Sequence, residues 1–192
     1  HAIPSRDRFA PCREQLAQKP AEYESAECFS RVALNESMWT ESTRVFQSLI
    51  DAYPDNFWLP LAYGNAWERR NPDRAEQLYR QAVAGFSASG HAEGELLARS
   101  TLRTFLFPRG RIEEATREAE RVAAIGDASE KPQLKAAAWS LQELHVQDSG
   151  GDLGHAGRLL KQAEVALFPD GPYPLKRAIL ASVGQVAFRL SS

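Results

Sequence analysis

The sequence lacks the features that mark several classes of protein. Its 192 residues carry a net charge of −2, so bulk charge indicates neither a nucleic-acid partner nor an anionic membrane. No apolar run approaches the roughly 20 residues that cross a bilayer, so we predict no membrane span. The alternation of apolar and polar residues that marks β-strands is almost absent. A helical globular chain is the class that remains.

Catalytic and metal-binding motifs are missing as well. The sequence contains neither a Gly-x-Ser-x-Gly elbow nor a glycine loop that cradles phosphate. The histidines are His1, His91, His145 and His155, and no two stand four residues apart, as paired zinc ligands on one helix do. We therefore predict no metal, no cofactor and no catalytic residue, and we do not expect the chain to be an enzyme.

Cysteine is scarce, and the two cysteines are Cys12 and Cys28. Pro20 marks a turn between two helical stretches, and facing residues of an antiparallel hairpin closed there have numbers that sum to about 40. The two cysteines satisfy this sum. A disulfide would indicate an oxidising, extracytoplasmic compartment. Two buried, reduced thiols in a cytoplasmic protein have the same spacing, so both alternatives stay open.

Apolar residues recur at every third or fourth position, which is the period of an amphipathic helix. Turn residues such as Pro54, Gly90 and Gly110 interrupt the pattern at regular intervals. Short links make neighbouring helices antiparallel, so the predicted fold class is all-α. The pattern predicts about ten helices, over 7–18, 21–35, 40–53, 56–70, 73–87, 91–107, 111–125, 132–148, 153–167 and 174–190.

A short loop followed by a helix recurs along the chain. A small residue stands at the same place in each copy, at Ser42, Ala75, Ala115 and Ala156. We expect the second helix of each pair to cross the first at these positions, because a larger side chain would push the two helices apart.

One of these units resembles the tetratricopeptide repeat. Its first helix contains Leu-Ala-Tyr-Gly-Asn-Ala-Trp at 61–67, and Ala75, Tyr79 and Ala82 follow. The family pattern has Leu-Gly-x-x-Tyr on the first helix and Ala-x-x-x-Phe-x-x-Ala on the second. The units at 91–125 and 132–167 lack the glycine and repeat after about 40 residues, not 34. The resemblance implies a right-handed superhelix, a single domain of about four helix pairs plus an unpaired C-terminal helix.

A second resemblance concerns the segment Ala-Leu-Phe-Pro-Asp-Gly-Pro-Tyr at 166–173. It looks like the repeat arrays that precede caspase-like CHAT protease domains in large bacterial proteins. This likeness implies a bacterial source and catalysis outside this chain. The chain begins without methionine and its last helix is apolar over a broad arc, so we expect a fragment of a longer array. Self-association through that helix is the alternative.

The repeat resemblance implies a concave groove lined by the first helix of each pair. Asn65 and Arg69 match positions that grip a peptide backbone or carboxylate, and the Arg fork can give two parallel hydrogen bonds. We expect a scaffold that binds a protein or peptide. A regulatory arm attached to a downstream catalytic domain and a structural oligomerisation module are the alternatives. The candidate groove residues are Trp58, Asn65, Arg69, Ser100, Thr104, Gln142 and His145.

Overall fold

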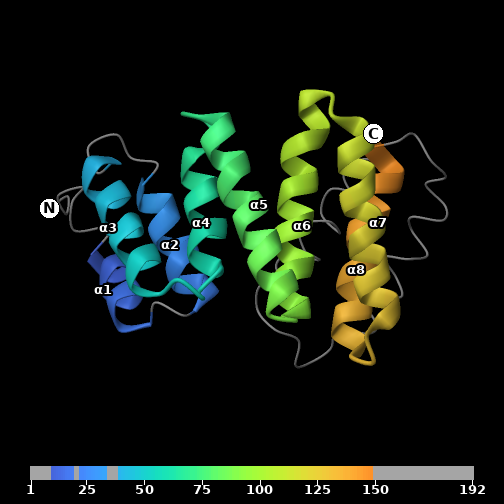
Figure 1. The fold of residues 1–192 in the computed structure, drawn as a ribbon, viewed down its shortest axis with the longest axis horizontal. Helices are drawn as coiled ribbons and strands as arrows, with labels where there is room; N and C mark the ends of the chain where they lie inside the picture. Colours follow the sequence, from blue (N-terminus) through green and yellow to red (C-terminus); the bar gives the residue numbers. More distant parts are fainter. Residues whose placement is uncertain (1–9, 20–21, 34–38, 149–192) are drawn as a thin grey trace, which may run out of the picture. The chain divides into compact units, whose positions relative to one another are not determined.

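The computed structural model describes residues 10–19, 22–33 and 39–148 of the chain. Within these ranges the chain forms eight α-helices and one short 3-10 helix, η2, and no strand (Figure 1). The all-α fold class is confirmed for this part of the chain. The helices are α1 (Ala10–Gln18), α2 (Tyr23–Ala33), α3 (Trp39–Ala52), α4 (Trp58–Trp67), α5 (Pro72–Ala88), α6 (Ala92–Leu106), η2 (Phe107–Arg109), α7 (Ile112–Ala128) and α8 (Pro132–Asp148).

These helices follow the predicted ranges closely, and the largest differences are at the ends of α4, which is shorter than predicted, and α7, which is longer. Helix α4 was expected to reach residue 70 but ends at Trp67, whose carbonyl accepts the N–H groups of both Arg70 and Asn71 at 2.9 Å. Asn71 precedes a proline and is therefore held in extended backbone, which stops the helix. The predicted helices 153–167 and 174–190, and with them Ala156, lie outside the described residues.

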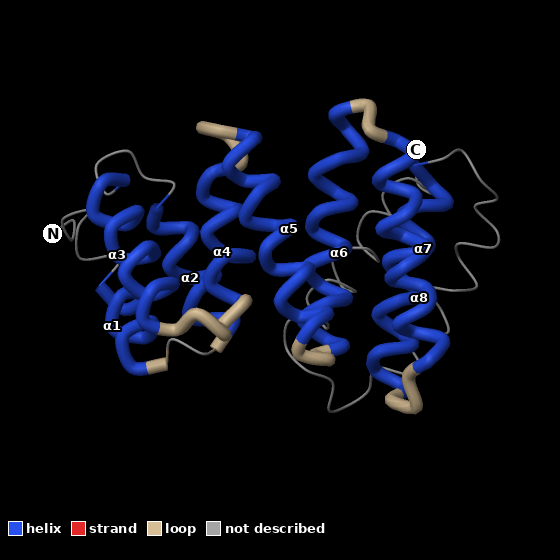
Figure 2. The backbone as a smooth tube through the Cα atoms, in the orientation of Figure 1, coloured by secondary structure: helices blue, strands red, loops and turns tan. Residues whose placement is uncertain are grey.

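The chain divides into two compact units, His1–Gly94 and Glu95–Ser192. The described part of the first unit holds α1 to α5 and the start of α6. The second holds the remainder of α6, with η2, α7 and α8. Figure 2 shows short loops between α3 and α4, between α4 and α5, and between α7 and α8, as the spacing of the turn residues predicts.

In the first unit, helix packing centres on α4. This helix lies against α2, α3 and α5, while α2 also packs on α1 and α3. None of its residues is exposed to solvent, and seven are buried: Leu59, Pro60, Leu61, Ala62, Tyr63, Gly64 and Ala66. Such a helix, apolar on all sides, is stable only when neighbouring helices cover each face.

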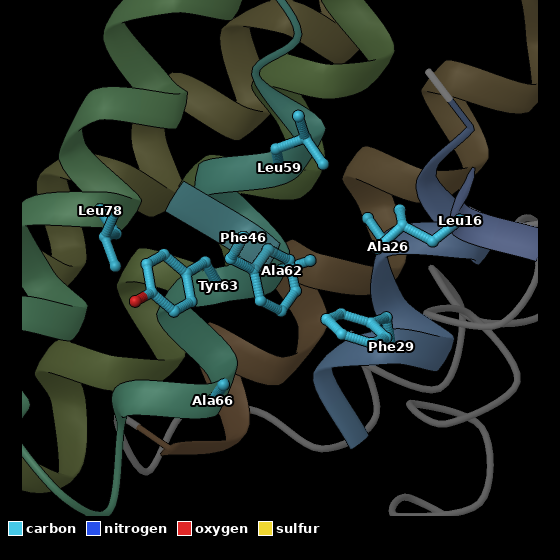
Figure 3. Packing of buried hydrophobic residues seen from close by; sticks show 9 residues of the cluster. All are labelled: Leu16, Ala26, Phe29, Phe46, Leu59, Ala62, Tyr63, Ala66 and Leu78. Carbon is cyan, nitrogen blue, oxygen red and sulfur yellow. The ribbon is translucent and has the colours of Figure 1, made fainter. Parts of the chain in front are cut away.

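Aromatic rings fill the core between these helices. Phe46 of α3 is fully buried and stacks on Tyr63 of α4, with ring centroids 4.7 Å apart. On its other side it meets Phe29 of α2, at a centroid distance of 5.2 Å. Figure 3 shows these rings from three helices converging on one another, with Ala62 beside them. The core therefore ties α2, α3 and α4 into one packed body.

Small residues stand at the close approaches between helices. Ser42, Ala75 and Ala115, three of the four predicted crossing residues, are fully buried. A Cβ added at Gly64 would lie only 2.5 Å from the ring of Tyr79 on α5. The glycine of the repeat-like stretch is therefore required, because a side chain at this position would occupy the space of the Tyr79 ring.

The second unit is joined by close packing and by an ion cluster. α7 packs along α8, where a Cβ at Gly126 would overlap the side chain of Ala138. Arg99 of α6 binds Glu95 on its own helix and Glu118 on α7, each at 2.8 Å. Burial lowers the pKa of the Arg99 guanidinium, but the hydrogen bonds and charges of the two carboxylates outweigh it and raise that pKa. Arg99 therefore stays charged and links α6 to α7.

Replacing Asn71 with Ala is expected to destabilise the first unit by about 1 kcal/mol. The side-chain oxygen of Asn71 accepts the backbone N–H of Arg74 at 3.0 Å and caps the start of α5. Denaturant unfolding followed by circular dichroism measures the loss. Asn71→Asp keeps an acceptor and should remain within a few tenths of a kcal/mol of the parent. Equal losses in both variants would contradict the capping role.

Candidate functional site

A hollow of about 560 Å³ opens in the first unit, at one end of α3, α4 and α5. Its volume lies within the range of small-molecule and side-chain pockets. Figure 2 shows the loop between α3 and α4 and the turn after α5 at the same end of the helices. We call it the Trp58 hollow, and it is lined by Ala52, Tyr53, Pro54, Asp55, Asn56, Phe57, Trp58, Phe86, Ser89 and His91.

The loop between α3 and α4 forms one wall of the Trp58 hollow. After α3 ends, the carbonyl of Tyr53 accepts the N–H of Asn56 at 3.0 Å, which closes a turn containing Pro54. The side-chain oxygen of Asn56 then accepts the N–H of Trp58 at 3.2 Å and starts α4. This turn leaves Tyr53 46% exposed, an unusually open position for a large aromatic ring.

The opposite wall is formed by the end of α5 and the turn that follows. Gly90 has a φ of +67°, a left-handed conformation that costs glycine little and turns the chain sharply. His91 comes next, and its Nδ1 accepts the backbone N–H of Gly94 at 3.0 Å, capping the first turn of α6. Nδ1 is the acceptor in this bond and therefore carries no proton while the bond is formed.

Aromatic contacts hold Trp58 in place. Its ring lies 4.5 Å from Phe86, 5.0 Å from Tyr23 of α2 and 5.7 Å from His91, measured between centroids. All three contacts are tilted or edge-to-face, the favourable arrangements for aromatic pairs. The indole is half-buried and still lines the hollow, so it is a fixed aromatic surface that a ligand can touch.

The other predicted residues of the first unit have different environments. Asn65 is half-buried, and its side-chain oxygen accepts the Tyr79 hydroxyl at 2.9 Å. A carboxylate oxygen of Glu68 lies 3.3 Å from the same hydroxyl. Asn65 therefore links α4 to α5. Arg69 lies in the turn after α4, not on the helix, and is exposed to solvent. The roles of both in partner binding stay predictions.

In the second unit, the predicted residues lie on α6 and α8. Ser100 is buried, and its hydroxyl donates to the carbonyl of Leu96 at 2.7 Å. Thr104, one turn later, is exposed. Both line a depression of about 20 Å³ together with Arg103 and the α8 residue Leu141, so it has room for little more than a water molecule. This depression is too small to receive a partner's side chain.

The last two predicted groove residues lie on α8. Gln142 is half-buried, one position beyond the depression's Leu141. His145 belongs to the same helix, but its side chain lies outside the described part of the structure. Gln142 does not line the Trp58 hollow. Among the predicted site residues whose side chains the structure describes, therefore, only Trp58 lies in the larger of the two hollows.

Sequence reasoning missed most of the residues that surround Trp58. For Asp55 and Phe57 the local sequence indicated a position near Trp58, because they lie between the turn residue Pro54 and the start of a helix. No local pattern placed Phe86 and His91 near Trp58. They follow it by about thirty residues and reach it only through the pairing of α4 with α5. The hollow is a product of tertiary packing.

Cys12 and Cys28 form a disulfide, with their Cα atoms 5.4 Å apart. The bond joins α1 to α2 at the level that the hairpin argument predicts. Of the two alternatives, the structure therefore contains the disulfide, and the reduced pair is not observed. Cys12 also packs against the buried cluster that contains Leu16.

Fold and hollow together define an all-α protein with an aromatic-lined surface site. Comparison with known proteins gives no match, since no family model fits the sequence and no curated protein or solved structure is significantly similar to it. Over residues 10–19, 22–33 and 39–148, no helix is long and apolar enough to cross a membrane. Within the same ranges, no cluster of His, Cys, Asp and Glu could hold a metal ion.

Proposed function

We propose that this chain is a scaffold that binds a protein or peptide, built from stacked helix pairs of the tetratricopeptide kind. The packing of the first unit supports this architecture. α2 contacts α4 as well as α3, so the first helices of two successive pairs lie against each other, as in a solenoid. α4 in turn pairs closely with α5. Continuation of this pattern would give the right-handed superhelix of about ten helices.

The observation that carries the proposal is the Trp58 hollow at the start of α4. A half-buried aromatic side chain in a concave, mostly apolar site is typical of the places where a binding partner inserts a side chain. Arg69 is exposed just beyond the other end of the same helix. From Trp58 to Trp67 the axis of α4 rises roughly 14 Å, the span of about four or five extended residues. A short peptide is long enough to reach both ends.

Selection from a random peptide library displayed on phage tests the proposal. The oxidised, full-length chain is the bait, and synthetic copies of the selected peptides are titrated by isothermal calorimetry. We expect Trp58→Ala to weaken binding at least tenfold, because it removes a central aromatic contact worth about 2 kcal/mol or more. We expect Arg69→Ala to weaken it about threefold to tenfold, through loss of an exposed ion pair.

Arg44→Ala is the matched control for Arg69→Ala. Arg44 is an exposed arginine in the same unit but on α3, a second helix of a pair, where no groove is expected. Circular dichroism must show that each variant keeps the parent's helix content. Failure of the library to give any binding peptide would overturn the proposal. So would peptides whose affinity is the same for the parent, Trp58→Ala and Arg69→Ala.

A further inference from the structure

We propose that the Trp58 hollow receives a cationic side chain of the partner, the guanidinium of an arginine or the ammonium of a lysine. The inference rests on the proposed scaffold function and names the chemistry of the group that the scaffold recognises. It depends on three properties of the hollow: its charge, the helix ends around it and its aromatic walls.

The charge of the lining is negative. Asp55 is the only acidic residue among the described residues that line the hollow, and no lysine or arginine lines it. The Nδ1 atom of His91 accepts the N–H of Gly94, so this atom does not donate to a ligand. The Asp55 side chain is exposed and forms no hydrogen bond or ion pair with another described residue, so its carboxylate is open to an incoming cation. An anionic side chain would meet this carboxylate without a compensating positive charge.

The helix ends around the hollow favour the same sign. α3 ends at Ala52 and α5 ends just before Ser89, and both residues line the hollow. The C-terminal end of a helix carries a partial negative charge. α4 and α6 begin there, and N-terminal ends attract anions, but in both cases a side chain already accepts a terminal N–H: Asn56 for α4 and His91 for α6. The anion-attracting groups are thus partly satisfied within the fold.

The walls supply the remaining attraction. Tyr53, Phe57, Trp58 and Phe86 surround the space with aromatic rings. The face of such a ring attracts cations, most strongly for tryptophan, and arginine in addition stacks its flat guanidinium on it. The alkyl stem of arginine or lysine can lie on the same rings while its charged end reaches Asp55. A purely aliphatic side chain would use the walls but leave the carboxylate without a partner.

The test uses one-residue probes on the whole oxidised chain. The N-acetyl amides of arginine, norleucine and glutamate are titrated while NMR follows the indole N–H signal of Trp58, which is assigned with the Trp58→Phe variant. We expect the arginine probe to bind about five times more tightly than norleucine, the combined effect of one exposed ion pair and one cation–π contact. The glutamate probe should leave the signal unchanged.

Asp55→Asn should reduce the preference for arginine over norleucine to about twofold, because the ion pair is lost while the cation–π contact remains. Asp51→Asn is the matched control, because Asp51 is exposed on α3, bonds to Gln47 and does not line the hollow. It lowers the negative charge of the chain equally, so a general attraction of cations to the protein would respond to both changes. Equal binding of norleucine and arginine to the parent would overturn the inference, as would an arginine preference that is as large in Asp55→Asn as in the parent.

These outcomes are separable from those of the peptide selection. Selected peptides that bind through Trp58 but contain no basic residue would refute the cationic occupant and leave the scaffold function standing. A library that gives no binding peptide would refute the scaffold function, while the one-residue probes would still decide which charge the hollow prefers.

Discussion

Replacing Phe46 with Ala is expected to destabilise the first unit by about 3–5 kcal/mol, the range for deleting a buried phenylalanine. Phe46 has no exposed surface and contacts rings from two other helices, Phe29 of α2 and Tyr63 of α4. Its removal leaves a cavity that helices on three sides cannot close without moving. Unfolding in guanidinium chloride, followed by far-ultraviolet circular dichroism, measures the change.

Gln47→Ala is the matched control, on the neighbouring position of the same helix. Gln47 is exposed and its side-chain amide bonds only to the nearby Asp51 within α3, so the free energy of unfolding should change by less than about 0.5 kcal/mol. Phe46→Leu keeps most of the side-chain volume, so its loss in free energy of unfolding should lie between those of Gln47→Ala and Phe46→Ala. A loss below about 1 kcal/mol for Phe46→Ala, on the order of a substitution at an exposed position, would contradict the burial of Phe46 in this core.

Removing the disulfide, by changing Cys12 and Cys28 to Ser together, is expected to cost about 3 kcal/mol. The two cysteines are 16 positions apart, and a cross-link over a loop of this length restricts the unfolded chain strongly. The loss should fall on α1, because α1 buries little else: Leu16 is its one buried residue among those described. Thermal unfolding of the oxidised parent and the double variant measures the difference.

A reducing agent provides the internal control for this comparison. It should lower the melting temperature of the parent to that of the double variant and leave the double variant unchanged. A parent that melts at the same temperature with and without the reductant, although a thiol assay shows that the bond has been broken, would contradict the expected stabilisation. A disulfide of this kind is typical of an oxidising compartment.

Local signals in the sequence predicted the helices well. The turn at Asn71-Pro72 is an example, since asparagine caps α5 and proline forces the preceding residue out of the helical conformation. The sequence predicted the disulfide as one of two alternatives, because counting residues from the turn shows which positions face each other in a short helical hairpin. The small residues at the helix crossings, Ser42, Ala75 and Ala115, were also predicted and are buried.

The candidate site was predicted only in part. Trp58 was named because it begins a first helix, but the walls that make its surroundings concave come from the ends of α3 and α5 and from two turns. Their contacts depend on how far α4 is shifted along α5, which periodicity alone does not specify. Asn65 illustrates the same limit: its polar side chain was expected to face a groove, yet its oxygen bonds to Tyr79 across the helix pair.

The burial of α4 on every side has a practical consequence for shortening the protein. A fragment that stops after α4 would uncover the face that α5 now protects, and one that starts at α4 would uncover the face that α2 and α3 protect. Either cut would present a continuous apolar surface to water and promote aggregation. Shorter versions for crystallisation or NMR should therefore retain α2 through α5 without interruption.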